Sequence, residues 1–126
     1  MKLGISMEPL GTQADRSLIL DTSQQIEDLG FDFIFMSGHI LANALGSALD
    51  PLVLLAAVGA ATTRIRLATS VLVLPYYQPV VLANQAASLD VLSGGRFVLA
   101  VGTGWNNDEF DAVGISMRER GGLLHE

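Results

Sequence analysis

Apolar runs and helical patterns alternate along the first part of the chain. A short apolar run over residues 2–6 predicts a buried strand. The helical pattern that follows begins at Asp15 and ends at Gly30, since a capping carboxylate and a glycine are common at the two ends of a helix. A second apolar run over residues 32–36 predicts the second strand. The first part of the chain is therefore predicted to be strand, helix, strand.

The alternation continues after a loop rich in Gly, Asn and Ser over residues 37–49. Asp50 and Pro51 predict the start of a second helix that runs to Thr62, because the carboxylate caps free N–H groups and proline fits the first helical position. A run rich in β-branched residues over 65–74 then predicts a third strand, which ends at Pro75.

The last part of the chain repeats the pattern. Pro79 predicts the start of a third helix, which ends in the Ser-Gly-Gly sequence at 93–95. Residues 96–101 form a fourth apolar run, and Asn106 or a neighbour is placed to cap a further helix. The predicted order is βαβαβαβ followed by another helix, with parallel strands that are apolar on both faces.

Two α/β architectures use this repeat. An open doubly wound sheet is disfavoured, because the turn at 7–13 lacks the G-x-G-x-x-G pattern. A receiver-type sheet would need an aspartate at the end of the third strand and a late lysine, whereas the only lysine is Lys2. The pattern favours the first half of a (β/α)8 barrel, with four parallel strands in a single domain over residues 1–126.

Composition narrows the class of protein further. Of the 126 residues, 50% are apolar, and 13 acidic against 7 basic side chains give a net charge of −6. This excludes disorder and argues against nucleic-acid binding, which needs clustered cations. The apolar stretches at 51–61 and 67–74 are shorter than a membrane span, and Glu8 comes too early for a signal peptide. We expect a soluble, cytoplasmic protein that has no membrane or nucleic-acid partner.

In a (β/α)8 barrel the chemistry lies just beyond the carboxyl ends of the strands. This rule selects Glu8 and the segments 37–39, 70–75 and 103–107. Within them, His39 is the one residue that titrates near neutral pH and is suited to moving a proton. The alternative is an ordinary solvated loop histidine, and the residue pattern leaves both interpretations open.

Residues 102–104 form a Gly-Thr-Gly sequence that is not a dinucleotide fingerprint, because Trp-Asn-Asn follows it. Small residues there would let a flat ring approach the backbone. The alternative is local: Asn106 and Glu109 have the spacing of an N-cap pair. The nearby acids Asp108, Glu109 and Asp111 are interpreted as first-turn acids that favour a helix dipole, and no metal site is predicted.

The small residues of the helix at 52–62 also allow two interpretations. They permit close contact either with another subunit or with a neighbouring helix of the same chain.

Several linked segments resemble the luciferase-like monooxygenases, in the same order along the chain. The segments that carry the resemblance are 50–61, 63–72, 79–83, 88–96 and 102–106. The similarity is greatest to the branch that uses the deazaflavin coenzyme F420, and it covers the first half of a family member. The resemblance implies a (β/α)8 barrel that binds F420, or alternatively FMN, at its carboxyl-terminal mouth.

The resemblance also implies roles for individual residues. His39 falls on a histidine that assists proton movement beside the ring. Ser70-Val71 falls on a non-proline cis peptide, a bulge that backs the ring. The implied cofactor-binding residues are Ser70, Val71, Val73, Thr103, Gly104, Asn106 and Asn107. Gly38 departs from the family pattern, in which Asp or Glu commonly precedes the histidine.

Two functions are therefore carried forward. The first is an oxidoreductase that transfers hydride between F420, or reduced FMN with O2, and a small organic substrate. The alternative is a non-catalytic, truncated half-barrel that depends on self-association, since its exposed strand edges need a partner. In both cases we expect a homo-oligomer, most simply a dimer.

Overall fold

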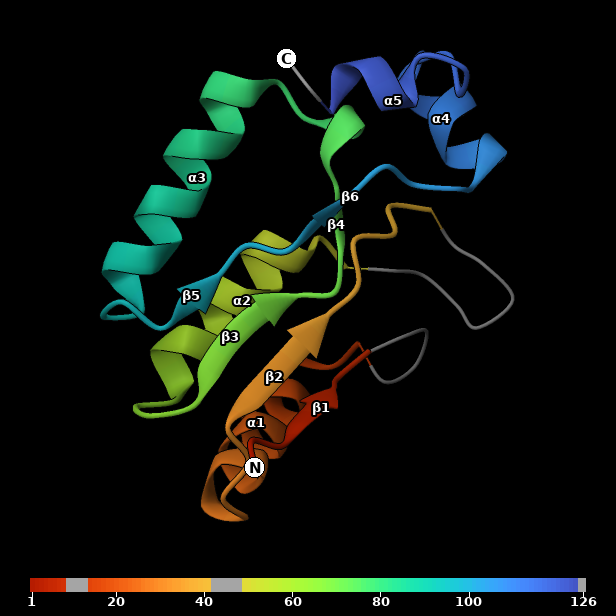
Figure 1. Ribbon diagram of the computed structural model, residues 1–126. Coiled ribbons are helices and arrows are strands. Elements are labelled where there is room, and N and C mark those ends of the chain that lie inside the picture. Colours follow the sequence, from red (N-terminus) through yellow and green to blue (C-terminus); the bar gives the residue numbers. More distant parts are fainter. Residues whose placement is uncertain (9–13, 42–48, 125–126) are drawn as a thin grey trace.

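The computed structural model describes residues 1–8, 14–41 and 49–124. The predicted turn at 7–13 and loop at 37–49 therefore lie partly outside the described residues. Strands and helices alternate along the chain (Figure 1). The elements are β1 (Gly4–Ser6), α1 (Arg16–Asp28), β2 (Phe33–Met36), α2 (Pro51–Ala61), β3 (Arg66–Thr69), β4 (Leu72–Val73), a 3-10 turn (Leu74–Tyr76), α3 (Pro79–Leu92), β5 (Phe97–Val98), β6 (Val101–Gly102), α4 (Asn107–Val113) and α5 (Arg120–Leu123).

The helices begin where their capping residues predict. The Asp15 carboxylate accepts a hydrogen bond from the Leu18 N–H at 3.0 Å, and Asp50 accepts one from the Val53 N–H at 2.9 Å. Each bond satisfies a donor that the first helical turn leaves free. Among the described residues, even the longest helix, the 14-residue α3, falls short of the length and apolar character that a membrane span requires.

Four strands form one parallel sheet in the order β1-β2-β3-β5. Helix α1 packs on α2, and α2 packs on both α3 and β3, so the helices cover one side of the sheet (Figure 1). The core lies between these layers, with Ile34, Leu55 and Leu67 fully buried. This is the alternating parallel arrangement that the sequence predicts.

The two faces of the sheet differ in burial. On β2, Ile34 and Met36 are buried against the helices, while Phe33 and Phe35 alternate with them and are only half-buried. These two rings stack at 5.7 Å on the face that carries no helix. The strands are thus apolar on both faces as predicted, but only one face is covered by the described part of this chain.

The runs at 65–74 and 96–101, each predicted as one strand, are each divided into two short strands. Pairing stops after Ala68↔Val98 and resumes at Leu72↔Val101, so three residues on one strand face two on the other. Between these pairs the Ser70–Val71 peptide is cis. The Thr69 hydroxyl accepts from the Ala100 N–H at 2.8 Å and donates to the Ala100 carbonyl at 2.7 Å, and so replaces the missing ladder bonds. The result is a bulge that separates β3 from β4 and β5 from β6.

At the opposite end of the sheet, two charged side chains tie helix ends to strand starts. The Glu27 carboxylate accepts from the backbone N–H groups of residues 63–65 at 2.6–3.1 Å. The guanidinium of Arg96 donates to the Gly59, Thr62, Ile65 and Ser93 carbonyls and to the Thr62 hydroxyl at 2.6–3.1 Å. Both anchors leave the carboxyl ends of the strands free for other groups.

Candidate functional site

The carboxyl ends of the strands bring together segments that are far apart in the sequence. Glu8, just beyond β1, accepts from the Ser37 hydroxyl at 2.7 Å and from the Ser37 backbone N–H at 3.1 Å. These bonds fix the start of the segment that follows β2 and carries His39. The segments predicted to lie at this end of the sheet are Glu8, 37–39, 70–75 and 103–107, and each of them follows a strand here.

Three glycines allow these segments to pack closely around the Ser70–Val71 cis peptide. A Cβ added to Gly38 would lie 2.5 Å from the Val71 carbonyl oxygen, and one added to Gly102 would lie 2.7 Å from Val71 Cγ2. Gly104 has φ +77°, and its Cβ would meet Val73 Cγ1 at 2.5 Å. An Asp or Glu, as in the family pattern, would not fit at Gly38 without a shift of the backbone. Val71 itself stays 44% exposed at this surface.

A buried carboxylate from α4 lies behind this surface. Glu109 is 1% exposed, and its Oε1 accepts from the backbone N–H groups of Ile40 at 2.9 Å and Leu41 at 3.2 Å. Both of its oxygens lie 3.1 Å from Nδ1 of His39, and Oε2 accepts from the Tyr76 hydroxyl at 3.2 Å. Glu109 therefore joins the segment after β2, the 3-10 turn and α4.

The surroundings of Glu109 keep it ionised. Burial opposes its charge, but hydrogen bonds from Ile40, Leu41 and His39 outweigh burial and lower the pKa of the Glu109 carboxyl. The same surroundings raise, rather than lower, the pKa of the neighbouring Tyr76 phenol. Burial, followed by the charge of Glu109 and the hydrogen bond to it, raises the pKa of Tyr76 to about 12. The pair is thus a carboxylate and a neutral phenol at neutral pH.

His39 is held on two sides. Its side chain is 27% exposed, Nδ1 is bonded to Glu109, and its ring meets Trp105 edge to face at 5.5 Å. Nε2 makes no hydrogen bond to any part of the chain that the structure describes. His39 is therefore not an ordinary solvated loop histidine, and its second nitrogen is the one left for another group.

Two predicted site residues, Asn106 and Asn107, lie at the start of α4. The Asn106 side chain accepts from the Asp108 N–H at 3.0 Å and caps the helix, while Asn107 is its exposed first residue. The predicted Asn106–Glu109 capping pair is wrong, because Glu109 points away from the cap toward His39. Sequence reasoning missed Glu109 as a site residue. No local signal in the sequence marks it, because its partner His39 lies 70 residues away.

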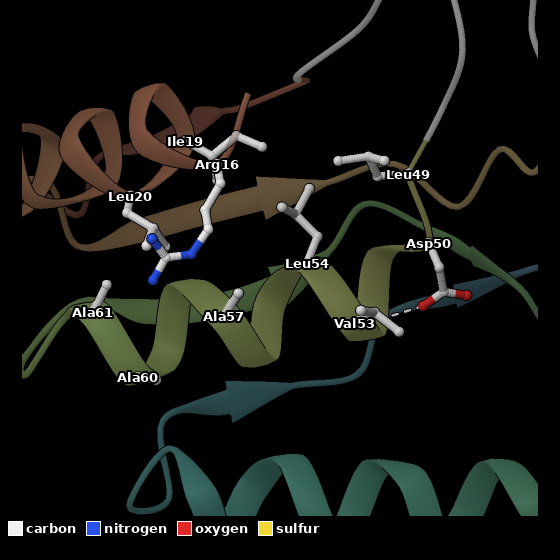
Figure 2. A pocket seen from close by; sticks show the side chains of 10 residues that line it. All are labelled: Arg16, Ile19, Leu20, Leu49, Asp50, Val53, Leu54, Ala57, Ala60 and Ala61. Carbon is white, nitrogen blue, oxygen red and sulfur yellow. Dashed lines mark hydrogen bonds between the residues drawn. The ribbon is translucent and has the colours of Figure 1, made fainter. Parts of the chain in front are cut away.

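A separate cavity of about 580 Å³ lies between α1 and α2 (Figure 2). Its lining is apolar apart from Arg16 and Asp50, and Arg16 extends from α1 toward α2. None of the predicted site residues contributes to it. Over residues 1–8, 14–41 and 49–124, no cluster of three or more acidic or histidine side chains is placed to bind a metal ion.

The family of the chain follows from comparison with known proteins. The family model of the luciferase-like monooxygenases matches residues 4–126. The chain therefore belongs to the luciferase-like monooxygenase family, as the sequence resemblance implied.

Two curated relatives illustrate the range of the family. The chain is 34% identical over 111 residues to 4-hydroxyprotoasukamycin monooxygenase of Streptomyces nodosus subsp. asukaensis, a match that spans 86% of this chain and 30% of the relative. It is 42% identical over 89 residues to F420-dependent glucose-6-phosphate dehydrogenase of Microbacterium testaceum, spanning 68% of this chain and 26% of the relative. The chain thus spans less than a third of the length of these relatives.

Solved structures support the fold. The oxygenating constituent of 3,6-diketocamphane monooxygenase from Pseudomonas putida, a type II Baeyer-Villiger monooxygenase in complex with FMN, aligns with a TM-score of 0.86. The alignment covers 99% of this chain and 36% of that chain at 21% identity, so it bears on the fold alone. The chain has the α/β fold of part of a TIM barrel, with parallel strands that alternate with helices, as predicted.

Proposed function

We propose that the chain carries the cofactor-ring site of an oxidoreductase that transfers hydride between coenzyme F420 and a small organic substrate. FMN with O2 is the alternative cofactor chemistry. The observation that carries the proposal is the convergence of His39, the Ser70–Val71 cis peptide and the Gly104 turn at one end of the sheet. The family contains relatives of both kinds, and the 42% identity to an F420-dependent dehydrogenase favours F420 as the first cofactor to test.

The residues present suit a flat ring. The exposed Val71 side chain offers an apolar contact, and the packed glycines around it keep other side chains out of the way. Thr103 and Gly104 directly precede Trp105, whose 72% exposed indole meets the imidazole of His39 edge to face at 5.5 Å. An apolar surface with a few polar groups at its edge is the usual composition of a cofactor site.

The chain and the cofactor would have separate tasks. A bound deazaflavin or flavin supplies the hydride chemistry, and the protein supplies orientation and proton handling. Ser70, Val71 and Val73 would support the ring, while Thr103, Gly104, Asn106 and Asn107 would hold it from the segment that follows β6. His39 would hold or release a proton at Nε2, because Nδ1 is already committed to Glu109.

Titration of the chain with F420 and with FMN, each in its own experiment, tests the proposal. We expect quenching or a spectral shift of the cofactor that saturates with protein concentration. Substitution Val71→Asp should weaken that binding, because it places a charge at the apolar contact. The matched control Val53→Asp changes a valine that is 71% exposed on α2 and should leave binding unchanged. Absence of a saturable signal with both cofactors would refute the proposal.

A second candidate function is a non-catalytic half-barrel that acts by self-association. Four apolar side chains on α3 favour it, namely Val80, Val81, Val91 and Leu92, which are 54–79% exposed. The uncovered Phe33–Phe35 face of the sheet adds further apolar surface. Exposed apolar side chains in such numbers are common at interaction sites of soluble proteins. Light scattering across a dilution series tests this candidate: we expect a dimer, and a stable monomer at all concentrations would refute it.

A further inference from the structure

We propose that Glu109 is a positioning residue for His39, which keeps the imidazole proton on Nδ1 and leaves Nε2 as the proton-accepting atom of the site. The catalytic meaning of this role rests on the proposed function, whereas the state of the ring can be measured without a cofactor. The proposal assigns a task to a carboxylate that lies 70 residues from its partner in the sequence.

The argument begins with the charge of Glu109. An ionised carboxylate has only acceptor sites, so every polar group that bonds to it must donate. The backbone N–H groups of Ile40 and Leu41 can only donate, and the Tyr76 hydroxyl donates its proton. His39 Nδ1 lies 3.1 Å from both oxygens and therefore carries a proton whenever this bond is made.

The consequence falls on the other ring nitrogen. A neutral imidazole has one N–H and one lone pair, so a proton on Nδ1 leaves the lone pair on Nε2. The bonds to Ile40 and Leu41 hold the backbone next to His39 against the same carboxylate, and Trp105 limits ring rotation from the side. Both the tautomer and the direction of the ring are therefore set by Glu109 and its neighbours.

Replacement of Glu109 by glutamine separates this role from a purely structural one. The glutamine oxygen can still accept the two backbone N–H groups, which both point at Oε1, so the link to the segment after β2 is kept. The NH2 group then takes the place of Oε2, within reach of His39 Nδ1. The oxygen that stays near Nδ1 already accepts from the N–H groups of Ile40 and Leu41, whereas the NH2 group only donates. The exchange therefore favours the opposite tautomer, with the proton on Nε2.

The measurement is the pair of imidazole 15N signals of His39, correlated with the ring protons at a pH well above the ordinary histidine range. The chain has 2 histidines, so a His125→Gln background leaves His39 alone in the spectrum. We expect the Nδ1–H form in the otherwise unchanged chain and a shift of the major population to the Nε2–H form in Glu109→Gln. Tyr76→Phe is the matched control, since it removes a neighbour of Glu109 but keeps the charge, and should retain the Nδ1–H form.

Two outcomes overturn the proposal: an Nε2–H ring in the otherwise unchanged chain, or a tautomer that Glu109→Gln leaves unchanged. If Glu109→Gln does not fold, two measurements on the parent chain test the proposal instead. They are the carboxyl 13C signal of Glu109, which reports its ionisation, and the tautomer of His39. An ionised carboxyl at neutral pH beside an Nδ1–H ring supports the proposal, and a protonated one contradicts it. Failure of F420 and FMN to bind would refute the proposed function while leaving this result in place.

Discussion

Replacement of Arg96 by methionine should destabilise the fold far more than replacement of Arg66 by methionine. The guanidinium donates five hydrogen bonds of 2.6–3.1 Å to groups at the ends of α2 and α3 and at the start of β3. Methionine preserves an unbranched apolar side chain but removes every donor. Four carbonyl groups and one hydroxyl would lose a partner at once.

The expected size follows from these bonds. A hydrogen bond contributes about 1 kcal/mol net, which for five bonds gives an upper figure of about 5 kcal/mol. Arg96 is half-buried, so water can reach some of the released carbonyl groups and reduce the loss. The Gly59 and Thr62 carbonyls lie at the end of α2, where a cation also favours the helix dipole by about 0.5 kcal/mol. We therefore expect Arg96→Met to lower the free energy of unfolding by about 3 kcal/mol.

Urea unfolding followed by circular dichroism measures this change. At an m value of about 2 kcal/mol/M, a loss of about 3 kcal/mol lowers the midpoint by about 1.5 M. Arg66→Met is the matched control, because the Arg66 guanidinium lies 5.2 Å above the Phe33 ring and is exposed. Its loss should cost less than about 1 kcal/mol. Equal midpoints for the two variants would refute the anchoring role of Arg96.

Three further predictions concern glycine geometry and titration. In thermal unfolding, Gly104→Ala should destabilise the fold by about 2–3 kcal/mol and Gly114→Ala by about 1 kcal/mol. Both glycines have positive φ, but only the Cβ added at Gly104 meets a side chain. Equal losses of stability would contradict the close packing of Gly104 against Val73. Burial opposes ionisation of Glu27, but the N–H groups of residues 63–65 lower its pKa, so stability present above the ordinary glutamate pKa of about 4.5 should be lost as pH falls below it. The stability of Glu27→Gln should therefore depend less steeply on pH in this range, and a pH dependence equal to that of the parent chain would contradict this. Burial is the main cause that raises the pKa of both tyrosines to about 12, so absorbance should detect no phenolate in the folded chain at pH 10.

Local chemistry made most of the fold predictable. Asp15, Asp50 and Pro79 each act within one helical turn, so their effect on helix starts depends on near neighbours alone. The break in the third strand depends on pairing with a distant segment. The bulge between Thr69 and Leu72 is defined by hydrogen bonds to Ala100, and hydrophobic periodicity carries no information about such bonds.

The site was predictable only in part. The resemblance to the family located the cis peptide at Ser70–Val71, which the structure contains. It also indicated His39, but not the partner that holds it. Glu109 has the spacing of an ordinary capping residue, and only the three-dimensional packing of α4 turns it toward His39. Long-range side-chain pairs of this kind leave no trace in local periodicity.

The central claim is that a cofactor ring binds at the carboxyl ends of the strands. Amide 1H–15N spectra of the chain, recorded during titration with F420 and then with FMN, test it residue by residue. The account predicts saturable shifts at Val71, Val73, Thr103, Gly104 and His39 with one of the two cofactors, and none at Ala57, Ala60 or Ala61 beside the cavity between α1 and α2. Shifts confined to that cavity, or no shifts with either cofactor, would contradict it.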